Sequence, residues 1–211
     1  MRRLLSGAAA LAIASTIAFA GMASAAEETD SPEVMQLPAV LINEVSTMGP
    51  NGALDEAIEI INTTPEQIDL VNWVLKIYNQ RNEVIQTIPL VDLTGESIVL
   101  QPANNVGSSL VLTGAEFSGT VTTPNVLPVR FMGEEGIPVH GGVAIFGTAA
   151  PNAFKIDGVA FSSAVVAAKE GVHAQPENQR TAQLAGSNTR NLLNQDTNNN
   201  QRDFSLQERT F

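Results

Sequence analysis

Short runs in which every second side chain is apolar are the feature that most constrains this chain. The clearest run covers residues 69–78, where Val71, Trp73, Leu75 and Ile77 alternate with other side chains. A period of two places successive side chains on opposite faces of a β-strand, and an aromatic residue in the series indicates that one face is buried. The spacing therefore favours half-buried strands over helices.

Similar runs recur along the chain, separated by Gly, Pro, Asn and Asp, which favour turns. About nine strands are predicted from ten candidate runs, of which 97–101, 110–112 and 126–131 are the weaker ones. The others are at residues 39–45, 57–62, 69–78, 83–88, 142–146, 154–161 and 204–206. The run at 83–88 is the expected hairpin partner of 69–78, and the Ala-rich residues 163–172 could form one or two helical turns. Without helical crossovers between strands, the pattern predicts an all-β, antiparallel β-sandwich.

The first 25 residues have the order of a secretory signal peptide. Two arginines are followed by an apolar stretch, and Ala23-Ser24-Ala25 supplies small residues for cleavage. We expect cleavage between Ala25 and Ala26, a secreted or extracellular protein, and a flexible acidic lead-in at residues 26–38. No later apolar stretch has the length of a membrane span, so no transmembrane anchor is expected in the mature form.

Charge and composition narrow the classes of function. The chain has 22 acidic and 11 basic residues, a net charge of -11 and no cysteine. An acidic surface disfavours a nucleic-acid partner, because binding to the phosphate backbone depends mainly on cations of the protein. The lack of cysteine excludes disulfides, cysteine-ligated zinc and thiol nucleophiles.

Three blocks of sequence stand out when they are taken together. They are Leu41-Ile42-Asn43-Glu44-Val45 with Asp55-Glu56-Ala57-Ile58-Glu59-Ile60-Ile61-Asn62, then Ile68-Asp69-Leu70-Val71-Asn72-Trp73-Val74-Leu75, and last Ser187-Asn188-Thr189-Arg190 with Asp196-Thr197-Asn198-Asn199-Asn200 and Asp203-Phe204. In this order they resemble the lamin tail domain, an immunoglobulin-like module also found in exported bacterial proteins. The resemblance spans residues 39–206, with an atypical insertion at 90–139 and a C-terminal tail at 207–211.

The resemblance implies an immunoglobulin-like sandwich that serves as a binding or interaction module. No catalytic residues are known for the fold itself, so none is carried over. Trp73, Arg190, Asp203 and Phe204 match the family's pattern and are expected to be structural, with Arg190 and Asp203 as an ion pair. Asn72 departs from the family's usual glycine.

One loop carries oxygen-bearing side chains at alternate positions, namely Asp196, Asn198 and Asn200. Such oxygens are the ligands that calcium selects, so these three residues are a candidate calcium site. An EF-hand is excluded, because Gln201 and Gln207 stand where that motif has Gly and Glu. The alternative is a loop whose side chains bond to nearby backbone and support the last strand. No other cofactor is expected.

Motifs for enzymatic chemistry are missing from the sequence. There is no glycine-rich phosphate loop, no Gly-x-Ser-x-Gly elbow and no His-Glu-x-x-His zinc motif. His140 and His173 each lie in Gly-flanked loop sequence without a nearby Ser and Asp partner. No catalytic residues are therefore predicted.

Three acidic residues, Asp55, Glu56 and Glu59, lie close together in sequence. Paired carboxylates act as acid and base in glycoside hydrolysis when they share a cleft. The alternative is that Glu56 or Glu59 faces solvent, or pairs across strands with Lys76 or Arg81.

We expect a secreted, non-catalytic, lamin-tail-like module that binds a protein or polysaccharide of the cell envelope or extracellular space. One alternative is a metal-dependent extracellular hydrolase, or an accessory subunit to one, because the family is often joined to exported nucleases and phosphatases. The other is a structural component of the cell surface. Because loops carry function more often than the scaffold, residues 90–139 and 174–200 are the first places to look for the binding surface.

Overall fold

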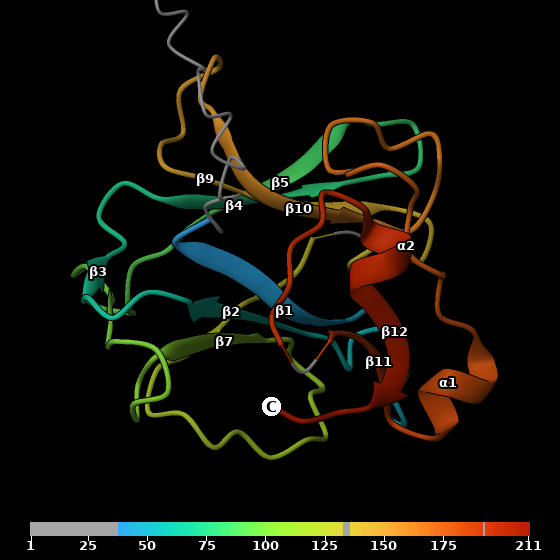
Figure 1. The fold of residues 1–211 in the computed structure, drawn as a ribbon. Coiled ribbons are helices and arrows are strands. Elements are labelled where there is room, and N and C mark those ends of the chain that lie inside the picture. The colour runs from blue at the N-terminus through green and yellow to red at the C-terminus, as the bar shows by residue number, and fades with distance from the viewer. Residues whose placement is uncertain (1–37, 133–135, 192) are drawn as a thin grey trace, which may run out of the picture. The chain divides into compact units, whose positions relative to one another are not determined.

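The computed structural model describes residues 38–132, 136–191 and 193–211, whose regular secondary structure is mostly β-strand (Figure 1). The predicted signal peptide, its cleavage site at Ala25 and Ala26, and the lead-in before Pro38 lie outside the described residues. None of the helices in the described ranges is long and apolar enough to cross a membrane.

Six strands form the larger sheet, in the order β12-β11-β1-β2-β7-β8. They are β1 (Val40–Ser46), β2 (Ala57–Asn62), β7 (Ser109–Thr113), β8 (Val126–Pro128), β11 (Gly186–Arg190) and β12 (Phe204–Glu208). All neighbouring strands are antiparallel except β7 and β8, which are parallel. Strand β8 lies at the edge of the sheet and ends at Pro128, which cannot donate a backbone hydrogen bond to a neighbouring strand.

Four strands form the smaller sheet, in the antiparallel order β10-β9-β4-β5. They are β4 (Val74–Tyr78), β5 (Val84–Pro89), β9 (Gly142–Phe146) and β10 (Lys155–Ala160). Two further short strands, β3 (Ile68–Asp69) and β6 (Val99–Leu100), pair with each other. The predicted hairpin is confirmed, since β4 and β5 are antiparallel neighbours joined by a short turn with Asn82 at φ 64°.

One apolar core joins the two sheets. Ile42, Ile58 and Leu112 of the larger sheet belong to the same buried cluster as Leu75 and Ile145 of the smaller sheet. Figure 1 shows the smaller sheet above the larger one, with β11 and β12 to the right. Burial of these apolar side chains supplies the main driving force for bringing the sheets together.

The run at residues 69–78 is not one strand, and its alternation is incomplete. The chain turns between β3 and β4, where Asn72 has φ 64°, and Val71 is 50% exposed. Val74 and Tyr78, on the other face of β4, are buried because they pack in one cluster with Val165 and Ala168, which lie in the turns after β10. Both faces of β4 are therefore covered, which a period of two does not predict.

The helices are short, and they lie outside the Ala-rich segment. Helix α1 spans Gln179–Gln183 and α2 spans Asn200–Asp203. Helix α1 begins where the Asn178 side chain accepts hydrogen bonds from the first turn, a capping box. Residues 163–172 instead form turns with a single i to i+4 hydrogen bond, from Lys169 N–H to the Val165 carbonyl.

The described residues hold twelve strands, against about nine expected. The range 90–139 is part of the core, because its strand β7 pairs with β2 inside the larger sheet. Strand β11 was not predicted, since its residues are polar, yet all five are buried. At the C-terminus, β12 runs to Glu208 and Phe211 is buried against Ala57 and Val111, so residues 207–211 are packed rather than a free tail.

Candidate functional site

Arg190 lies at the centre of a buried polar network. Its side chain is 0% exposed. Its Nε donates to the Ile42 carbonyl at 2.9 Å, and Nη1 donates to the Gln195 carbonyl at 3.2 Å. Its Nη2 donates to both oxygens of Asp157, at 3.0 and 2.8 Å. One guanidinium thus ties β11 to β1, to β10 and to the loop before α2.

The predicted pairing of Arg190 with Asp203 is present, since Nη1 lies 3.6 Å from Asp203 Oδ2. Asp203 also accepts hydrogen bonds from the N–H and hydroxyl of Thr197, at 2.9 and 2.7 Å. The guanidinium stacks over the Phe204 ring, 4.6 Å from its centroid, where a cation is attracted to the ring face. These contacts hold the polar loop against the start of β12.

The three residues predicted to bind calcium have different environments. The side-chain oxygen of Asn200 accepts from the N–H groups of Ala160 and Glu170, at 3.1 and 3.0 Å. Asn198 is exposed at φ 53°, and its N–H donates to Asp196 Oδ1 at 3.0 Å. The alternative prediction, a loop supported by its own side-chain hydrogen bonds, describes Asn198 and Asn200 better than shared ligation of one ion.

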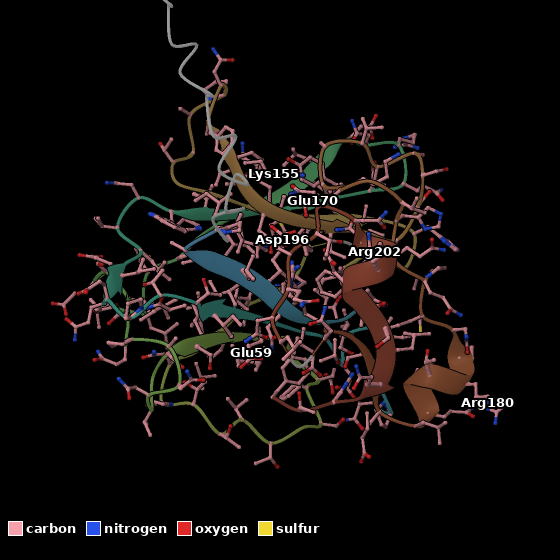
Figure 2. The ribbon with its side chains drawn as sticks, in the orientation of Figure 1. Glu59, Lys155, Glu170, Arg180, Asp196 and Arg202 are labelled. Atoms are coloured by element: carbon pink, nitrogen blue, oxygen red, sulfur yellow. The ribbon has the colours of Figure 1, made fainter. Side chains whose placement is uncertain are left out.

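A different set of carboxylates meets beside Arg190. Oxygens of Asp157, Glu170 and Asp196 all lie within 4.8 Å of one another, and all three residues are buried. In Figure 2, Glu170, Lys155 and Asp196 are drawn close together near β10 and α2. Burial, together with the nearby charge of Asp157, raises the pKa of Glu170 to about 7, although Lys155, 3.2 Å from Glu170 Oε1, acts to lower it. These carboxylates have the oxygen donors that a hard metal ion requires.

Arg209 forms a second buried ion pair, near the C-terminus. Its Nη1 lies 2.8 Å from Asp55 Oδ1, and its Nη2 donates to the Asp55 carbonyl at 2.6 Å. Burial raises the pKa of Asp55, but hydrogen bonds from Ser118, Asn51 and Arg209 outweigh that effect and leave this pKa lowered. Asp55 is therefore ionised at neutral pH and joins the C-terminal residues to the start of β2.

The neighbouring residue, Glu56, faces a pocket of about 360 Å³. The pocket is lined by Leu54, Glu56, Thr113, Gly114, Ala115, Pro128, Val129, Arg130 and Phe131. Glu56 is 1% exposed, its Oε1 accepts the N–H of Ile137, and its Oε2 has no hydrogen-bond partner among the described residues. Burial, together with the charges of Asp55 and Glu177, raises the pKa of Glu56 to about 8. At neutral pH the carboxyl is mostly protonated and can act as a hydrogen-bond donor.

The predicted cross-strand ion pairs of these acids are absent from the described residues. Glu59 accepts a hydrogen bond from Asn43 Nδ2 at 2.6 Å, and Arg81 pairs with Glu83 at 3.0 Å. Asp55 and Glu56 differ in environment although they are adjacent, so no acid–base pair in a shared cleft is evident here. Burial also raises the pKa of Glu59.

The two histidines stay outside these networks. His140 is exposed, and His173 Nδ1 lies 2.8 Å from the carbonyl of its neighbour Ala174. Within the ranges that the structure describes, neither ring forms a hydrogen bond or an ion pair with a carboxylate or a hydroxyl.

Sequence reasoning missed the roles of Asp157, Glu170 and Glu56. Asp157 did give a signal, because it is the only acid in the apolar run at residues 154–161 and a buried charge needs a partner. Glu170 gave none, since it lies beside Lys169 in a turn-rich segment. Glu56 was considered, but the pocket depends on strands distant in sequence.

Comparison with known proteins adds no relative. No protein-family model matches the chain, and no curated protein matches it either. The resemblance to the lamin tail domain therefore stays a prediction that rests on the residues of the three blocks. Within the structure these blocks fall on β1 and β2, on β3 and β4, and on the segment from β11 to β12.

Proposed function

We propose that the mature chain is a secreted, non-catalytic interaction module with an immunoglobulin-like β-sandwich of the lamin-tail type. It binds a protein partner of the cell envelope or extracellular space at the pocket around Glu56. The observation that carries this proposal is the pocket of about 360 Å³ with a buried carboxyl oxygen that has no hydrogen-bond partner among the described residues. Such a polar group within apolar walls is typical of a binding site.

The arrangement of the sheets supports the immunoglobulin-like part of the proposal. Two largely antiparallel sheets share one core, as the two sheets of such a sandwich do. The third block of the lamin-tail pattern also contacts the first, because Arg190 bonds to Ile42. Residues that define the resemblance thus meet in space.

The walls of the pocket favour a protein over a polysaccharide. Leu54, Val129 and Phe131 present apolar surface, whereas Glu56 supplies a buried carboxyl group. Such a site suits one side chain with an apolar body and a hydrogen-bond acceptor at its tip. Most of the lining comes from residues 113–131, within the range where the sequence pointed to a binding surface.

The burial of the other carboxylates argues against the hydrolase alternative. Asp157, Glu170 and Asp196 are all buried, so a macromolecular substrate would not reach them in this conformation. The remaining alternative, a structural component of the cell surface, stays a prediction. Fractionation of cells tests it, because such a component would remain bound to cells rather than in the culture supernatant.

Selection of a random-peptide library on the immobilised chain 26–211 tests the proposal. We expect selected peptides whose affinity falls more than about tenfold when Ala115→Trp fills the exposed mouth of the pocket. Ala149→Trp places the same bulk at an exposed position outside the pocket and should leave affinity unchanged. Peptides that bind the two variants equally well would place the binding surface elsewhere.

A further inference from the structure

The acids beside Arg190 outnumber the bases. Asp157, Asp196 and Asp203 lie within 4.0 Å of the Arg190 guanidinium, and Glu170 is paired with Lys155. Four carboxylates thus share two cationic side chains, all in a largely buried region. When all four acids are ionised, the cluster therefore carries two negative charges that no side chain compensates. Excess buried charge of this kind is costly unless a cation balances it.

The side chain of Glu170 independently indicates that this carboxylate cluster binds a further group. Its side chain is 8% exposed, and its Oε2 has no hydrogen-bond partner within the described part of the chain. Lys155 does not supply one, because its ammonium lies 3.2 Å from the other oxygen, Oε1, and 3.2 Å from the carbonyl of Lys169. An orphaned buried oxygen next to two further carboxylates is an available ligand.

Asp157 and Asp196 can also bind a cation without losing their present hydrogen bonds. Each carboxylate oxygen has two acceptor positions. Asp157 Oδ1 accepts one hydrogen bond, from Arg190, and Asp196 Oδ1 accepts one, from the N–H of Asn198. Free acceptor positions therefore remain on both groups.

From this geometry we infer that Asp157, Glu170 and Asp196 bind one divalent cation, for which Ca²⁺ is the best fit. Calcium binds oxygens at about 2.3–2.6 Å, so two ligands of one ion lie no more than about 5 Å apart. The observed limit of 4.8 Å satisfies this condition. Calcium also tolerates irregular geometry, whereas magnesium requires a nearly ideal octahedron. The ion stabilises the junction of β10 with the loop before α2, and its binding does not depend on the Glu56 pocket.

Thermal unfolding of the mature chain 26–211 with and without calcium tests this inference. After removal of divalent ions with EDTA and dialysis, 1 mM CaCl₂ should raise Tm by about 5 °C or more, because an ion that binds only the folded state stabilises it. Isothermal titration should give one ion per chain. The same concentration of MgCl₂ should raise Tm less.

Variants locate the ion. Glu170→Gln keeps the shape of the side chain but removes its charge, and should lower calcium affinity more than about tenfold. Glu177→Gln is the matched control, because Glu177 is a second buried acid with a raised pKa, and it bonds to Thr47 outside the cluster. The Glu177 variant should keep the wild-type response to calcium.

Two results would overturn the inference. One is a wild-type chain whose Tm and titration heat do not respond to calcium. The other is an equal response in wild type and Glu170→Gln, which would indicate binding elsewhere on the acidic surface. If Glu170→Gln does not fold, Asp196→Asn takes its place, and the wild-type titration alone still decides whether an ion binds.

Discussion

The Arg190 centre, formed by Arg190 with Asp157, Asp196 and Asp203, and the Glu56 pocket both bury carboxyl groups, but they do so in opposite ways. At the Arg190 centre, Asp157 receives two hydrogen bonds from a guanidinium and one from the Ile42 N–H. At the pocket, Glu56 receives a single backbone N–H, and its pKa rises to about 8 because burial is not matched by a cation. The contacts of Asp157 hold β1, β10 and β11 together, whereas Glu56 keeps an oxygen without a hydrogen-bond partner among the described residues and bonds to no cation there.

The adjacent residues Asp55 and Glu56 make the same contrast at close range. Arg209, Ser118 and Asn51 hydrogen-bond to Asp55 and keep its pKa low despite burial. No cation bonds to Glu56 among the described residues, so burial dominates and its pKa is raised. The partners that folding brings to each carboxyl, rather than its position in the sequence, decide its charge at neutral pH.

The largest expected effect is that of Arg190→Met. It leaves Asp157 and its neighbours buried without their main cation, and removing one partner of a buried ion pair costs about 3–5 kcal/mol. We expect a loss of that size in the free energy of unfolding measured in urea. If the chain has ordinary marginal stability, a loss of this size leaves much of the variant unfolded, which circular dichroism would show.

Arg81→Met is the control for this prediction. Arg81 also belongs to an ion pair, but its side chain is 74% exposed. Exposed pairs contribute little, so the urea midpoint should stay close to that of wild type. Equal effects of the two substitutions would contradict the structural role given to the Arg190 centre.

A smaller and pH-dependent effect is expected for Glu56→Gln. Because the pKa of Glu56 rises from 4.5 to about 8 on folding, the unfolded chain releases this proton first as the pH increases. Glu56 therefore lowers stability progressively from about pH 4.5 to pH 8, by up to a few kcal/mol. Glutamine removes this penalty, so the variant should gain in Tm relative to wild type as the pH rises from 4.5 to 8.5.

Glu66→Gln, at an exposed position, is the control for the pH series. Its Tm should follow that of wild type at every pH. A constant difference between Glu56→Gln and wild type across the series would show that Glu56 does not titrate differently in the folded and unfolded chains.

Local patterns predicted much of the β-structure. Alternation and turn residues located β1, β2, β9 and the hairpin of β4 and β5, because those strands place apolar side chains in the core. Strand β11 was missed since its polar residues Ser187 and Asn188 are buried by pairing with β1 and β12. Whether these residues form a buried strand depends on neighbouring strands far away in sequence, and a local pattern contains no information on those neighbours.

The candidate sites were predictable only in part. Arg190, Asp203 and Phe204 were found through the lamin-tail pattern, and the contacts among them are present. Asp157 lies 33 positions from Arg190 and meets it only because β10 packs near β1 and β11. Likewise, the pocket at Glu56 forms between the residues just before β2 and residues 113–131, which no spacing in the sequence connects.

Native-state hydrogen exchange tests the contrast between the two regions most directly, through two backbone N–H groups. The Ile42 N–H donates to Asp157 at the Arg190 centre, and the Ile137 N–H donates to Glu56 at the pocket. We predict that Ile42 exchanges only through global unfolding, whereas Ile137 exchanges at least about tenfold faster through local opening. Equal protection of the two groups, or slower exchange of Ile137, would contradict the account.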